Sequence, residues 1–237
     1  MMKTEILKNL TEKIKILKQQ IDMDNSYRVP VECQYLSPEA MERIRREDSS
    51  YKKNILLKLE LSSLLSSVND VNLLNDIYRW IIHSWGGIRR FQSFERIPLF
   101  MKELTEGNLT DTRSLSSLSK VASFVDPGKY FIYDSRVSFV LNWLLYESGE
   151  RDSFFQVLLG RSEKTRVNMN MLCNMIKENG GEFMSGSESY IEYCNLIKCL
   201  YKSIWGEGGT TPFELEMLLF QSRDIVIEEM EQKNIQQ

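Results

Sequence analysis

Apolar residues recur along most of this chain every three or four positions, the spacing of the buried face of an amphipathic helix. The first such stripe predicts a helix over residues 2–24 and consists of Ile6, Leu10, Ile14, Leu17 and Ile21. Further helices are predicted from Pro38 onward, over 53–66, 70–84 and 94–105, around Lys120, after Asp134, over 152–160, 163–179 and 187–204, and from Thr211 to about residue 231. No run alternates between apolar and polar residues over the length of a strand. The pattern therefore predicts an all-α fold.

Several residues mark the ends of these helices. Ser37 precedes Pro38, an order that favours a helix start because serine caps the helix and proline suits its first turn. Gly86 and Gly87 follow the 70–84 helix, where glycines end a helix and let the backbone adopt a positive φ or approach a ligand closely. Asp134 stands immediately before an apolar helical run, in the position of an N-cap.

The size and composition suit a folded globular protein. The chain has 237 residues, of which 42% are hydrophobic, with only 12 Gly and 5 Pro. This length suits one generous domain or two lobes that share a cleft. We expect a single all-helical domain over 1–237, with approximate lobes formed by 1–90 together with 150–237, and by 91–149.

Charge and cysteine content restrict the function classes. The net charge of −3 and the pI near 5.5 are not typical of nucleic-acid binders, although such proteins can gather their basic residues on one face. No apolar run approaches the ~20 residues of a membrane span. The four cysteines lack the clustered spacing of a zinc or iron–sulfur site, so neither a metal nor a cofactor is expected. Free thiols without a signal peptide lead us to expect a cytoplasmic protein.

The run Ile132-Tyr133-Asp134-Ser135-Arg136-Val137 holds the most informative carboxylate. Free amides and the macrodipole at a helix N-terminus favour the charged form of an aspartate, typically by ~0.3–1 kcal/mol. A charged carboxylate in this position either only caps its helix or stabilises positive charge that develops on a substrate. The local pattern is compatible with both interpretations.

The stretch from Ile88 to Leu145, about a quarter of the chain, resembles the helix–hairpin–helix DNA glycosylases. The similarity consists of Lys120 in a helix, the Pro127-Gly128 break, and the run around Asp134. In that family the corresponding aspartate is the catalytic carboxylate, and in bifunctional members an upstream lysine is the nucleophile. The resemblance therefore implies catalytic roles for Asp134 and Lys120. Within the family, the chain resembles the bacterial anti-phage glycosylases that remove glucosylated hydroxymethylcytosine from phage DNA.

The chain departs from the family in its hairpin. The glycine-rich hairpin that normally holds a DNA phosphate is replaced by Thr110–Ser117, which contains no glycine. We therefore expect two helical lobes around a cleft with a degenerate hairpin. The departure leaves three roles open for Lys120: nucleophile, phosphate ligand, or partner of Asp134.

The turn after the 70–84 helix and the two helix starts supply candidate DNA-binding and base-binding residues. Aromatic and guanidinium groups beside a glycine turn suit phosphate contact and base stacking. The candidates in the turn are Trp85, Gly86, Gly87, Arg89, Arg90, Phe91 and Gln92. Those beside the catalytic candidates are Ser119, Tyr133, Ser135 and Arg136. For each of them, core packing, capping or a surface position is the alternative explanation.

Two functions follow. The resemblance implies a monofunctional DNA glycosylase that extrudes a modified base from double-stranded DNA. In this interpretation Asp134 activates the attacking water and Lys120 assists. The product is an abasic site, and the role is defence against phage. Glycine turns at 86–87 and 206–209 would make room for a bulky base. The absent glycine hairpin and the acidic pI favour the alternative, a non-catalytic helical DNA-binding or protein-interaction module on the same scaffold.

Overall fold

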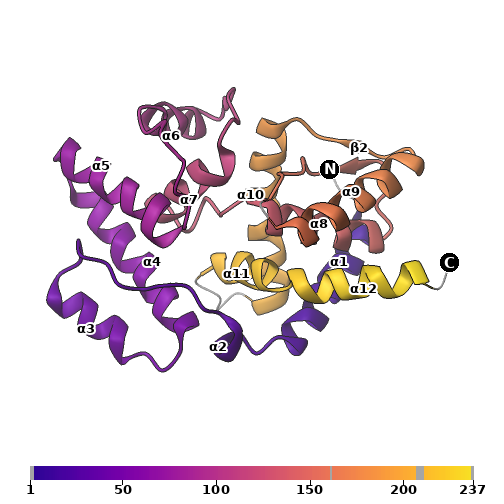
Figure 1. Ribbon diagram of the computed structural model, residues 1–237, viewed down its shortest axis with the longest axis horizontal. Helices are drawn as coiled ribbons and strands as arrows, with labels where there is room; N and C mark the ends of the chain where they lie inside the picture. Colours follow the sequence, from indigo (N-terminus) through magenta and orange to yellow (C-terminus); the bar gives the residue numbers. More distant parts are fainter. Residues whose placement is uncertain (1–2, 161, 207–210, 236–237) are drawn as a thin grey trace. The chain divides into compact units, whose positions relative to one another are not determined.

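The computed structural model describes residues 3–160, 162–206 and 211–235 and is mostly helical (Figure 1). The all-α prediction is confirmed at this level. The helices are α1 (Thr4–Gln20), α2 (Met23–Ser26), α3 (Pro38–Arg46), α4 (Ser50–Ser67), α5 (Val71–Arg79), the π-helix η1 (Trp80–Trp85), α6 (Arg96–Glu106), α7 (Leu115–Val125), α8 (Ser135–Glu147), α9 (Glu163–Glu178), α10 (Gly186–Trp205), α11 (Phe213–Gln221) and α12 (Arg223–Ile235). Two short strands, β1 (Ser153–Phe154) and β2 (Glu182–Phe183), pair in parallel.

The chain divides into two compact units, each with its own internal packing. Unit 1 contains residues 1–22 and 133–237, and unit 2 contains residues 23–132. These boundaries differ from the expected lobes, which divided the chain near 90 and 149. The difference arises because α7 packs on α4, α6 and η1, whereas α8 packs on α1, α9, α11 and α12. The chain therefore passes from one unit to the other between Ile132 and Tyr133.

Unit 2 is built around α4. This helix buries Leu57, Leu61 and Leu65 on one side, and α2, α3 and α7 pack against it. Its N-cap is Ser49, whose hydroxyl accepts a hydrogen bond from the N–H of Lys52 at 3.2 Å. The helix expected over 70–84 is divided into α5 and the π-helical η1, which continue without a break.

Unit 1 is built around α8, whose residues from Val137 to Leu145 are all buried. The predicted stripe of the first helix is confirmed, since Ile6, Leu10, Ile14 and Leu17 of α1 are at most 5% exposed. Helix α1 packs against α8 and α10. A stripe with period 3.6 on α1 thus covers a helix that is apolar on most of its surface.

Residues 152–160 were expected to form a helix, and this prediction is wrong. Residues 153 and 154 form β1, and the following segment to Gly160 contains neither helix nor strand. Buried polar side chains of α8 bind its backbone instead: the Asn142 side chain exchanges two hydrogen bonds with Phe155, at 2.8 and 2.9 Å, and the Ser138 hydroxyl accepts from the N–H of Leu158 at 3.3 Å. We call residues 153–160 the strap. Side chains of α8 thus supply hydrogen-bond partners to backbone groups of the strap that a helix would otherwise pair internally.

The helix expected from Thr211 to about 231 is interrupted at Ser222. This residue is fully buried, and its hydroxyl donates to the carbonyl oxygen of Leu218 at 2.7 Å. Such back-bonding competes with the helix ladder and favours a break. In the described part of the chain, no helix has both the length and the apolar composition that a bilayer span requires.

Candidate active site

The segment Trp85–Gln92 lies in unit 2, where η1 ends in a turn. The N–H of Gly86 donates to the carbonyl oxygen of Ile81 at 2.9 Å, and Gly87 has a φ of 65°. The predicted helix end is therefore confirmed, and Gly87 adopts the positive φ that was one of the two roles considered for the glycines. The preceding turn is π-helical. This geometry is rare in proteins, and where it occurs it is often found at functional sites.

Both aromatic residues of this segment are buried. The indole N–H of Trp85 donates to Oδ1 of Asn54 at 2.9 Å, and its ring meets Phe124 edge-on with centroids 4.8 Å apart. Phe91 packs edge-on against Phe94, with centroids 4.9 Å apart. These contacts account for both side chains as parts of the core of unit 2. Base stacking is not needed to explain either residue.

The polar residues of the segment face solvent. Arg89, Arg90 and Gln92 are exposed, and neither guanidinium is paired with a carboxylate within the described ranges of the chain. Two arginines next to a glycine turn can contact a phosphate through charge-assisted hydrogen bonds. These three side chains, together with the exposed Gly87, are therefore accessible to a ligand.

Lys120 lies against the glycine turn. It is only 7% exposed, and its Nζ donates to the carbonyl oxygen of Ser116 at 3.1 Å. A Cβ on Gly86 would lie 2.8 Å from the Cδ atom of Lys120, closer than such atoms approach one another. Glycine at position 86 thus makes room for the lysine stem. The structure brings together two candidates, Gly86 and Lys120, that the sequence treated separately.

Most of α7 is also buried, including three of its serines. Ser117, Ser119 and Ser123 are at most 5% exposed, and the Ser123 hydroxyl donates to the carbonyl oxygen of Lys120 at 2.8 Å. Small hydroxyl residues let the neighbouring helices approach α7 closely. Ser119, a predicted base-binding residue, is fully buried in the structure.

An arginine–carboxylate cluster lies between α6 and α7, in the segment before Lys120. Asp111 forms ion pairs with Arg96 and Arg113, each at 2.7 Å. Hydrogen bonds from Arg113 are the main reason that the pKa of the Asp111 carboxyl lies far below its usual range. Ser114 has a φ of 62°, which is the left-handed conformation that a glycine normally adopts, and α7 begins at the next residue. Ion pairs therefore hold this turn, in which a serine adopts a glycine-like conformation.

Asp134 caps α8 in unit 1, as its position in the sequence predicted. Its Oδ1 accepts hydrogen bonds from the N–H groups of Arg136 at 2.9 Å and Val137 at 3.2 Å. The side chain is half-buried. These two hydrogen bonds hold the carboxylate in one orientation at the start of the helix.

Three tyrosines and a second carboxylate surround this helix start. The Tyr133 ring lies 5.0 Å from that of Tyr193 and 6.3 Å from that of Tyr190. Burial raises the pKa of Tyr193 well above its ordinary value, and the nearby carboxylates of Glu216 and Asp134 raise it further. Glu216 is only 3% exposed. Two carboxylates therefore share the surroundings of one buried phenol.

The remaining candidates of unit 1 lie on the first turn of α8. Ser135 and Arg136 are both half-buried. The Arg136 guanidinium lies 4.4 Å from the centroid of the Phe220 ring, a cation–π contact between α8 and α11. Tyr133 donates a hydrogen bond from its hydroxyl to the carbonyl oxygen of Gln156 and so contacts the strap.

The two candidate catalytic residues thus belong to different units: Lys120 to unit 2 and Asp134 to unit 1. Sequence reasoning missed Glu216, although an acidic residue inside the apolar run of α11 was a usable signal. It also missed the contact between Gly86 and Lys120, which no local pattern reveals. The expected glycine turn 206–209 lies outside the described residues from position 207 onward.

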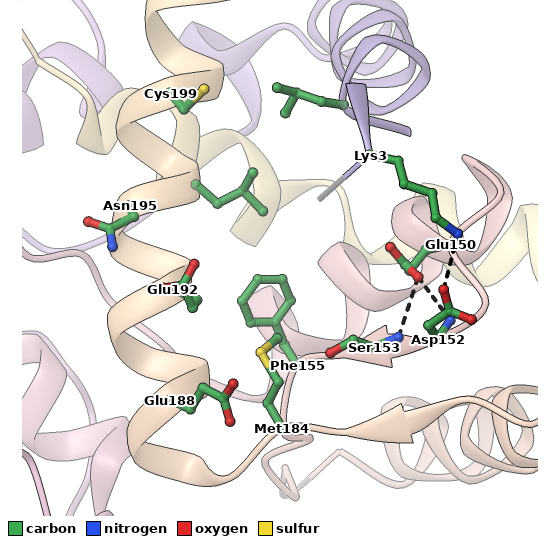
Figure 2. Close-up of a pocket in the computed structure, with 12 residues that line it drawn as sticks. Lys3, Glu150, Asp152, Ser153, Phe155, Met184, Glu188, Glu192, Asn195 and Cys199 are labelled. Carbon is green, nitrogen blue, oxygen red and sulfur yellow. Dashed lines mark hydrogen bonds and ion pairs between the residues drawn. The ribbon is translucent and has the colours of Figure 1, made fainter. Parts of the chain in front are cut away.

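A cavity of about 660 Å³ in unit 1 is lined by none of the predicted site residues (Figure 2). Within the ranges that the structure describes, no group of three or more His, Cys, Asp or Glu side chains could hold a metal ion. Comparison of the chain with protein-family profiles, curated proteins and solved structures found no match.

Proposed function

We propose that the protein is a DNA glycosylase that hydrolyses the bond between a modified base and its sugar. The observation that carries this proposal is the placement of Asp134. Its carboxylate is half-buried, oriented by two amides at the start of α8, and accompanied by the buried Glu216 and Tyr193. A carboxylate held in one orientation can stabilise the positive charge that develops on the sugar in the transition state.

In the proposed reaction one bond to C1′ of the sugar breaks and another forms. The C1′–N bond breaks, the base leaves with the bonding electron pair, and positive charge develops on the sugar. Asp134 stabilises that charge and accepts a proton from the attacking water, whose oxygen forms the new bond to C1′. The departing base takes up a proton, so the products are the free base and an abasic site. The base must first be extruded from the duplex.

Unit 2 contributes DNA binding in this proposal. Arg89 and Arg90 are exposed beside the Gly86–Gly87 turn, and α6 and α7 pack against each other across the turn that would correspond to the hairpin. This arrangement supports a helix–hairpin–helix glycosylase-like fold in which ion pairs replace the hairpin glycines. Lys120 assists without forming a covalent intermediate, because its stem is buried and its Nζ donates to a backbone carbonyl of its own helix.

The proposed substrate is a modified cytosine in double-stranded phage DNA, with glucosylated hydroxymethylcytosine as the specific candidate, and the proposed role is cytoplasmic anti-phage defence. The support is the resemblance of the stretch from Ile88 to Leu145 to the family, and within it to the anti-phage branch. The alternative is a non-catalytic DNA-binding or protein-interaction module, which the acidic pI of about 5.5 and the altered hairpin favour.

The deciding experiment measures abasic sites on a DNA panel containing normal, uracil, oxidised, alkylated, hydroxymethylated and glucosylated bases. Asp134→Asn removes the charge but keeps a good N-cap, so we expect a folded protein whose rate falls by about 10²–10³-fold. Asp70→Asn is the matched control, because Asp70 caps α5 through the N–H groups of Asn72 and Leu73. This control should leave the rate unchanged.

The outcomes separate the two functions. Abasic sites on one modified DNA, lost in Asp134→Asn and kept in Asp70→Asn, would establish the glycosylase and its base. DNA binding without abasic sites on any substrate would leave the non-catalytic module.

Borohydride trapping tests the monofunctional assignment. We expect no covalent complex with wild type, and we expect base removal to be retained in Lys120→Met, which keeps the apolar stem of the side chain. A trapped complex that disappears in Lys120→Met would instead make Lys120 a nucleophile.

A further inference from the structure

The cavity in unit 1 lies between α10, the strap and the beginning of α1 (Figure 2). Its volume of about 660 Å³ falls within the range of small-molecule sites. Its lining includes none of the residues assigned above to DNA or to base removal, so it is a separate feature of the molecule.

The walls of the cavity are acidic on two sides. Glu188 and Glu192 stand one helical turn apart on α10, and Glu150 and Asp152 stand opposite them beside β1 (Figure 2). Lys3 is the cation in this lining, and it pairs with Asp152 at 3.1 Å. Within the described ranges of the chain, the other three carboxylates form no ion pair.

Glu150 is the buried member of this set. It is 7% exposed, and its Oε1 accepts hydrogen bonds from the N–H groups of Arg151, Asp152 and Ser153 at 2.9, 2.9 and 3.3 Å. The amides fix the carboxylate in one orientation, and Figure 2 shows it facing the space between β1 and α10. Within the described part of the chain, these amides are the hydrogen-bond donors to Glu150, and no cationic side chain pairs with it. A cation bound in the cavity would supply that partner.

An apolar surface separates the two acidic sides. The ring of Phe155, which is 3% exposed, lies between them with Met184 beside it (Figure 2). Leu7 and Leu196 complete this apolar lining. The cavity therefore suits a molecule that carries positive charge at separated points and has an apolar chain between them.

A single metal ion does not fit this arrangement. Within the described residues, no group of three His, Cys, Asp or Glu side chains is close enough to hold one. Charges that are too far apart for one ion can instead be matched by several ammonium groups on a flexible chain. We infer that the cavity binds a linear aliphatic polyamine, with one ammonium at Glu150, another at Glu188 and Glu192, and the methylene chain across Phe155.

Calorimetric titration of the 237-residue chain with spermidine tests this inference. We expect saturable binding with one molecule per chain. Glu188→Gln/Glu192→Gln should weaken it about tenfold, since exposed ion pairs contribute up to about fivefold each. Glu150→Gln keeps an oxygen for the three amides and should weaken binding by more than about tenfold, because this carboxylate is buried.

Glu163→Gln/Glu178→Gln is the matched control, because it removes the same charge from exposed positions of α9 outside the cavity. It should change the affinity by less than about twofold. Hexylamine, with one ammonium, and Mg²⁺ at equal ionic strength should bind at least about tenfold more weakly. The inference is overturned by the absence of saturable binding, by an equal loss of affinity in the control, or by Mg²⁺ binding as tightly as spermidine.

Discussion

The bonds between Asn142 and the strap provide the sharpest test of how unit 1 is held together. Asn142 is fully buried on α8, its Nδ2 donates to the carbonyl oxygen of Phe155 at 2.8 Å, and its Oδ1 accepts from the N–H of the same residue at 2.9 Å. One side chain thus satisfies both backbone groups of a buried residue. Asn142→Ala would leave both of them without a partner.

The expected cost of Asn142→Ala follows from these two bonds. An orphaned buried donor or acceptor costs about 1–3 kcal/mol, so losing both should lower the free energy of opening the strap by about 2–4 kcal/mol after partial relaxation. Since 1.4 kcal/mol corresponds to a factor of ten, amide hydrogen exchange over residues 153–158 should accelerate by about 30- to 700-fold. Exchange in α4, which belongs to the other unit, should not change.

Asn179→Ala is the control for this measurement. Asn179 is exposed, and its amide donates to the carbonyl oxygen of Met175 at 2.8 Å and to the Tyr146 hydroxyl at 3.1 Å. Its loss should change stability by no more than about 0.5 kcal/mol. If the strap of Asn142→Ala exchanged at the wild-type rate, the two bonds would not hold it. Burial of Phe154 and Phe155 and the pairing of β1 with β2 would then be its main support.

Two further predictions concern unit 2. Gly86→Ala should lower the free energy of unfolding by about 1–3 kcal/mol in chemical denaturation, because its Cβ would clash with the Lys120 stem. Gly87→Ala has free space around its Cβ but a φ of 65°, so it should lower the free energy of unfolding by about 1–2 kcal/mol. Asparagine tolerates positive φ, so Gly87→Asn should recover stability and Gly86→Asn should not; recovery at both positions would contradict this distinction. Hydrogen bonds from Arg113 lower the pKa of Asp111 in the folded state, so this carboxylate stabilises unit 2 above its unfolded pKa of about 3.9 and loses that contribution as the pH falls below it. Thermal midpoints between pH 7 and 3 should therefore fall more steeply for wild type than for Asp111→Asn, and equal slopes would refute the assignment.

Most helices were predictable because their signals are local. The stripe of α1, the Ser37 cap of α3 and the Asp134 cap of α8 each depend on residues within one or two turns, and all three were found where the sequence placed them. The same holds for the end of η1 at Gly86. Spacing and caps act over a few residues, so reading the chain in order reveals them.

The strap shows where this approach fails. Residues 152–160 have an acceptable helical pattern, but Asn142 and Ser138 offer hydrogen bonds to their backbone from another helix. The break at Ser222 has a similar cause, since a hydroxyl that bonds to the preceding turn looks like any other polar residue in the sequence. A competing partner that lies far away in the chain cannot be identified from local periodicity.

Some features of the candidate site were likewise predictable from the sequence, and others were not. The sequence by itself determined that Asp134 begins a buried helix with its carboxylate on the free amides, because capping requires only the next three residues. Tertiary structure alone decided that Glu216 and Tyr193 join that carboxylate, that Trp85 and Phe91 belong to the core, and that Lys120 lies against Gly86. It also decided that Lys120 and Asp134 belong to different units. These relations depend on which helices pack together, and packing is settled by the fit of whole surfaces and not by any single stretch of residues.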